Sequence, residues 1–81
     1  MKIRLGKYEK DEFDAPLVLQ ALLEGYKVQY PSGDEYVTWI WYDGAIARVE
    51  DDEIQSVISY GYELRCFVEW VNFLEHIYIL A

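Results

Sequence analysis

Hydrophobic and polar positions along the chain fall into short alternating runs, separated by clusters of glycine, proline and acidic residues. Alternation of apolar and polar side chains, supported by β-branched and aromatic residues, is typical of strands that pack on one face. The runs predict strands over residues 2–8, 26–30, 35–42, 45–50, 54–60 and 77–80.

Two further stretches follow a helical period. Asp14 is a good N-cap, Pro16 fits the first turn and Gly25 fits the position after a helix end, which predicts a helix over 15–24. Apolar side chains at i, i+3, i+4, i+7 and i+10 predict a second helix over 63–75. The expected fold class is therefore α+β, a small single domain in which a twisted antiparallel sheet is packed by two helices.

The Asp43-Gly44 pair is the strongest hairpin signal, because both central residues of a type I′ turn take positive φ. A two-residue turn places Trp39 opposite Arg48 and Trp41 opposite Ile46, and it sorts the side chains onto two faces. The small, apolar face, which is the expected core, carries Thr38, Ile40, Tyr42, Ala45, Ala47 and Val49. The mixed face, expected to be partly exposed, carries Val37, Trp39, Trp41, Ile46, Arg48 and Glu50.

The mixed face has the composition of a binding surface, since exposed tryptophan beside arginine is frequent in interface hot spots. Trp39 and Trp41 are thus candidate protein-binding residues, and Arg48 is placed to stack on Trp39. The alternative is that a helix covers this face as well, so that both tryptophans belong to the core. A longer loop would exchange the two faces, so the sequence does not decide which face of the hairpin is exposed.

The charge of the chain is acidic and unevenly distributed. The net charge is −8: residues 1–30 contain five acids and five bases, whereas residues 31–81 contain ten acids with only Arg48 and Arg65. An acidic surface repels phosphate, which argues against direct binding of nucleic acid or of an anionic membrane. Solubility alone explains such an excess equally well.

Length and residue usage exclude several further classes. Residues 1–81 suffice for one hydrophobic core, and no apolar run reaches the roughly 18 residues of a membrane span. The first residues lack the apolar stretch of a signal peptide, and a lone cysteine excludes an internal disulfide framework. We expect one globular domain in a cytosolic compartment.

Residues suited to catalysis are few. His76 is the only histidine, and Cys66 lies ten residues before it, about three turns away on a helix, which is too far for a Cys–His pair. The run Glu50-Asp51-Asp52-Glu53 is acidic but lacks the spacing of a calcium loop, so we predict a solvated turn and no metal site. The sequence predicts a protein without enzymatic activity and without a cofactor.

Two segments resemble small proteins encoded by bacteriophages and prophages. One is a helix that ends in Leu-Leu-Glu-Gly before a strand, from Ala21 to Val28 (ALLEGYKV), and the other is an aromatic strand ending in Tyr42-Asp43-Gly44. Such proteins include anti-CRISPR proteins, and anti-Thoeris proteins that sequester a nucleotide signal. The resemblance implies a phage origin, a place in the host bacterial cytoplasm and an inhibitory binding role.

Acidic side chains at turns, beside aromatic anchors, predict an inhibitor that occupies a basic nucleic-acid groove by mimicking DNA. The expected partner is a host defence protein, namely a CRISPR effector nuclease. The candidate contact residues are Asp34, Glu35, Trp39, Trp41, Asp43, Glu50, Asp51, Asp52 and Glu53.

The alternative function is a homo-oligomeric small-molecule module that holds a nucleotide signal between subunits. Tyr30, Tyr36 and Trp41 are the side chains that would stack a base in this case. An acidic chain is a poor host for phosphate, and the sequence leaves open whether the chain forms a homodimer. A third hypothesis also fits the sequence: a generic interaction domain, such as an antitoxin or a structural phage component.

Overall fold

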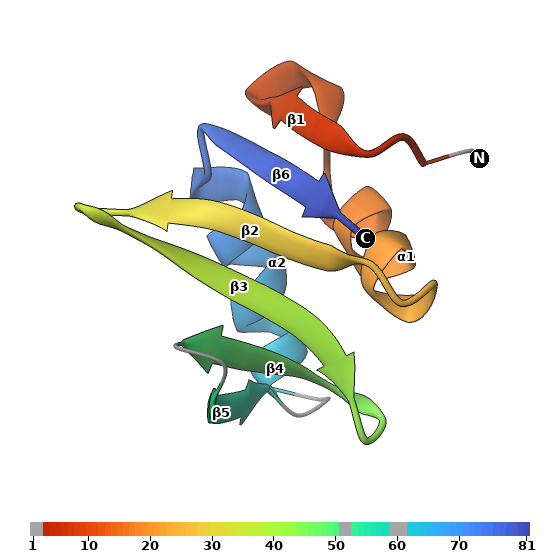
Figure 1. Cartoon of the computed structure of the whole chain (residues 1–81), viewed down its shortest axis with the longest axis vertical. Helices are drawn as coiled ribbons and strands as arrows, with labels where there is room; N and C mark the ends of the chain where they lie inside the picture. Colours follow the sequence, from red (N-terminus) through yellow and green to blue (C-terminus); the bar gives the residue numbers. More distant parts are fainter. Residues whose placement is uncertain (1–2, 51–52, 59–61) are drawn as a thin grey trace.

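The computed structural model describes residues 3–50, 53–58 and 62–81, which contain six strands, two α-helices and one short 3₁₀ helix (Figure 1). The elements are β1 (Gly6–Glu9), η1 (Lys10–Glu12), α1 (Ala15–Leu23), β2 (Lys27–Ser32), β3 (Glu35–Tyr42), β4 (Ala45–Glu50), β5 (Glu53–Ile58), α2 (Tyr62–Phe73) and β6 (His76–Leu80). One antiparallel sheet with two helices confirms the predicted α+β class.

The six described strands form a single sheet in the order β1-β6-β2-β3-β4-β5, and every neighbouring pair is antiparallel. From β2 to β5 the sheet is a meander of consecutive strands. β6 lies between β1 and β2, so the other half of the sheet joins segments that are distant in sequence (Figure 1). Alternation predicts strands one at a time and carries no information about this order.

Both α-helices lie on the same side of the sheet, behind the strands in Figure 1. Side chains from both helices and from alternate strand positions meet in one core. The largest side chains that are fully enclosed there are Val18, Leu22, Val28, Ile46, Val71, Ile77 and Ile79. Within the described ranges no helix covers the other side of the sheet, which we call the open face.

Helix α1 begins and ends through the signals that predict it. The Asp14 carboxylate accepts a hydrogen bond from the Leu17 N–H at 2.9 Å, which satisfies one of the donors left unpaired at a helix start. Gly25 follows the C-cap residue with a φ of +91°, a left-handed conformation that glycine adopts without strain. Phe13, just before the cap, packs against the core, as expected of a hydrophobic staple.

The β3–β4 hairpin confirms the predicted register. Asp43 and Gly44 have φ values of +50° and +77°, both positive as a type I′ turn requires. Trp39 pairs with Arg48 and Trp41 pairs with Ile46. The two-residue turn therefore fixes which side chains share a face, although it does not decide which face is buried.

Strand β2 runs two residues further than predicted. Pro31 and Ser32 were expected in the turn, but they pair with Tyr36 and Glu35 of β3. Proline lacks the N–H of a ladder bond and is tolerated where one neighbour is missing. The pairing of β2 with β6 ends at Gln29, so Pro31 lies where β2 pairs with β3 alone.

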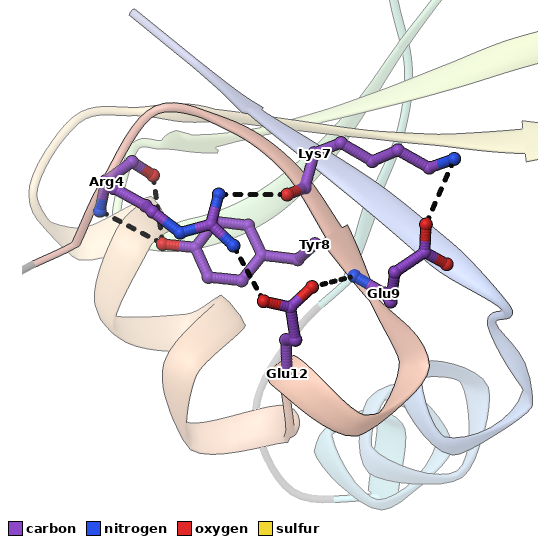
Figure 2. Close-up of polar contacts among 5 residues, drawn as sticks. All are labelled: Arg4, Lys7, Tyr8, Glu9 and Glu12. Carbon is purple, nitrogen blue, oxygen red and sulfur yellow. Dashed lines mark hydrogen bonds and ion pairs between the residues drawn. The ribbon is translucent and has the colours of Figure 1, made fainter.

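The first strand is shorter than predicted, because the residues before it bond to one side chain instead of a neighbouring strand. The Tyr8 hydroxyl donates to the Arg4 carbonyl oxygen at 2.9 Å and accepts from the Arg4 N–H at 3.0 Å. Both polar groups of the Arg4 backbone are thus satisfied locally, and β1 begins only at Gly6. Figure 2 shows the hydroxyl between these two groups.

The Arg4 guanidinium links the first strand to η1 (Figure 2). It lies over the Tyr8 ring, 4.2 Å from the centroid, and it is 2.9 Å from a carboxylate oxygen of Glu12. The second Glu12 oxygen accepts the Glu9 N–H at 3.0 Å, and together these contacts lower the pKa of Glu12. The ammonium of Lys7 lies 3.1 Å from the Glu9 carboxylate, which raises the pKa of Lys7.

We expect the Asp14→Ala variant to lose about 1 kcal/mol of unfolding free energy, because the Leu17 N–H loses its acceptor at the start of α1. Urea denaturation followed by circular dichroism measures this loss. Asp14→Asn, which keeps a side-chain oxygen at the cap, is the matched control and should stay within about 0.5 kcal/mol of the parent. Equal losses in both variants would show that the cap is not the source.

Glu12→Gln should lower the melting temperature at about pH 7 and leave it unchanged at about pH 3. The Glu9 N–H and the Arg4 guanidinium hold the pKa of Glu12 below its ordinary value of 4.5 in the folded chain. This contribution is present above pH 4.5 and is lost as the pH falls through the lower, folded pKa. Asp11→Asn, an exposed change in the same turn, is the control, and a pH-independent deficit for Glu12→Gln would contradict the assignment.

Candidate functional site

The open face of the sheet carries a shallow hollow of about 880 Å³ over its central strands. Successive side chains of a strand point to opposite faces, so Thr38 and Ile40 of β3 point away from the helices while Trp39 points toward them. Gln29 of β2 donates from its side-chain amide to the Thr38 hydroxyl at 3.3 Å. This bond and the half-buried Ile40 give the hollow a defined, partly apolar lining.

Three acidic residues contribute to one end of the hollow, although the Glu50 carboxylate itself lies 3.9 Å from the Arg48 guanidinium. Asp34 lies in the turn between β2 and β3, Glu35 is the first residue of β3, and Glu50 is the last residue of β4. Because β4 runs antiparallel to β3, its last residue lies near the beginning of β3. Glu53 pairs directly with Glu50 at the start of β5. Four of the predicted acids thus lie at the same end of the sheet, at two turns that are separate in sequence.

The other predicted acids are not part of this group. Asp43 occupies the turn at the far end of β3, roughly 26 Å away along an eight-residue strand. Asp51 and Asp52 lie outside the described residues. A single base, Lys27 of β2, is among the described residues that line the hollow, and it lies toward the Asp43 end because it precedes Val28, the partner of Trp39.

The expectation that the Ile40 face forms the core is wrong. Trp39 is 3% exposed and Val37 is 4% exposed, so the mixed aromatic face lies under the helices. The Trp39 ring meets Tyr30 at 4.8 Å and Phe67 of α2 at 5.4 Å between centroids. The large Trp39 ring fills the space between the sheet and α2, and the residues that alternate with it are left on the other face.

Trp39 therefore cannot act as an exposed protein-binding anchor, and Trp41 belongs to the same side. Trp41 is half-buried and packs against the core. Tyr30 is 3% exposed, and burial raises the pKa of its phenol. The proposed base-stacking group of Tyr30, Tyr36 and Trp41 is likewise divided, because Tyr36 lines the hollow on the opposite face.

The aromatic residues that the open face does present are tyrosines, which the sequence analysis assigned to the core or to another role. Tyr36 is 51% exposed and Tyr42 is 50% exposed, and both line the hollow. The Tyr36 ring meets Tyr78 of β6 edge-on at 6.1 Å, and Tyr78 meets His76 at 5.6 Å. The alternation of side chains along a strand could have predicted this exposure. If Trp39 is buried, Tyr36 and Tyr42 lie on the opposite face.

The histidine, the cysteine and the acidic side chains are the groups that could serve catalysis or hold a metal. Within the ranges 3–50, 53–58 and 62–81, no group of three or more His, Cys, Asp or Glu side chains is arranged to hold a metal ion. His76 lies beside the Tyr78 ring on β6, and Cys66 belongs to α2. Neither helix in the described part of the chain is long and apolar enough to cross a membrane.

Comparison with protein families, with curated proteins and with solved structures finds no match to this chain. The site is therefore described by its own geometry: an uncovered sheet face with exposed tyrosines and carboxylates gathered at one end.

Replacement of Trp39 by alanine should lower the free energy of unfolding by about 3–5 kcal/mol, because it empties a large site between the sheet and α2. Tyr36→Ala, three positions earlier on the same strand and on the opposite face, should change it by no more than about 0.5 kcal/mol. Chemical denaturation of both variants measures the difference. Similar losses in the two would contradict the assignment of the buried and open faces.

Proposed function

We propose that the chain is a non-enzymatic, acidic binding protein that occupies the basic nucleic-acid groove of a host defence protein, of the CRISPR effector class. The observation that carries the proposal is that Asp34, Glu35 and Glu50 line one hollow together with the exposed tyrosines of the open face. Carboxylates beside exposed aromatic rings are suited to bind lysine- and arginine-rich surfaces.

The charge of the whole chain supports the same conclusion. The entire excess of −8 lies in residues 31–81, which include the two turns that supply the carboxylates. DNA carries one negative charge per about 1.7 Å of helix axis, and a groove that binds it holds lysine and arginine at high density. Closely spaced carboxylates on a rigid sheet compete for such a groove and attract it over long distances.

The fold supplies the rigidity that this competition needs. Asp34 follows strand β2, Glu35 pairs with Ser32 at the start of β3, and Glu50 pairs with Glu53 across β4 and β5. Acids fixed on a sheet lose less conformational entropy on binding than acids on a flexible tail. Tyr36 and Tyr42 take the anchoring role that the sequence analysis gave to the tryptophans, since they are the aromatic side chains exposed on this face.

The resemblance of residues 21–28 and of the Tyr42-Asp43-Gly44 turn to phage and prophage proteins suggests the kind of partner. In an effector nuclease the protein holds the guide–target duplex in a positively charged channel and reads a short duplex motif beside it. An acidic protein seated in either place prevents target DNA from binding. The proposed result is inhibition of DNA binding, without any reaction on the partner.

Inhibition should depend on the carboxylates at the two turns and on salt. We expect the double variant Glu35→Lys/Glu50→Lys to weaken competition with target DNA at least tenfold in a binding assay with a panel of guide-loaded effector nucleases. The parent protein should also weaken as salt is raised from about 50 to about 500 mM, since the attraction is screened.

The matched control is Asp11→Lys/Glu24→Lys, which makes the same change of charge at exposed positions of η1 and the end of α1. This control should compete as the parent does. Equal losses in both double variants would show that net charge alone is responsible. Absence of competition by the parent at about 50 mM salt across the panel would overturn the proposal.

A further inference from the structure

We draw no further inference here: the strongest candidate, the surface patch on the outer side of α2 where Trp70 is 50% and Phe73 is 82% exposed, is an unpartnered apolar helix face, and nothing in the described part of the structure shows what covers it.

Discussion

The burial of one sheet face beneath two helices is the constraint on which the rest of the structure depends. Trp39 contributes the largest side chain of β3 to that face, and its contacts with Tyr30 and Phe67 join the middle of the sheet to α2. Once this face is covered, the alternation of a strand leaves the other face uncovered. Tyr36 and Tyr42 are half exposed as a consequence, because no described element covers this face.

Much of the local structure could be predicted, because it depends on few residues that act nearby. The N-cap at Asp14 and the glycine at Gly25 bound α1 to within one residue. The Asp43-Gly44 pair fixes both the turn and the register of β3 against β4, since few residues other than these accept positive φ in succession. The sequence predicts that these acids lie at turns and strand ends, but it does not predict which turns lie at the same end of the sheet.

The face that is buried could not be predicted from the hairpin, because both of its faces are largely apolar. The decision depends on Trp39, whose large ring fills the space beneath α2 and is matched in volume by no side chain of the other face of the hairpin. For this reason the exposed aromatic residues that could contact a partner are Tyr36 and Tyr42, and not Trp39 and Trp41. The order of the strands could not be predicted either, since the pairing of β6 with β1 and β2 is set by tertiary contacts that no local pattern encodes.

The place of β6 also sets how long the loops are that the chain must close to form the sheet. The meander from β2 to β5 forms from neighbouring segments and closes only short loops, which is fast. By contrast, Gly6 of β1 pairs with Ile79 of β6, so almost the whole chain lies between these two partners. β1 has no other neighbour among the described strands, so of all the pairings in the sheet this one closes the longest loop and costs the most loop-closure entropy.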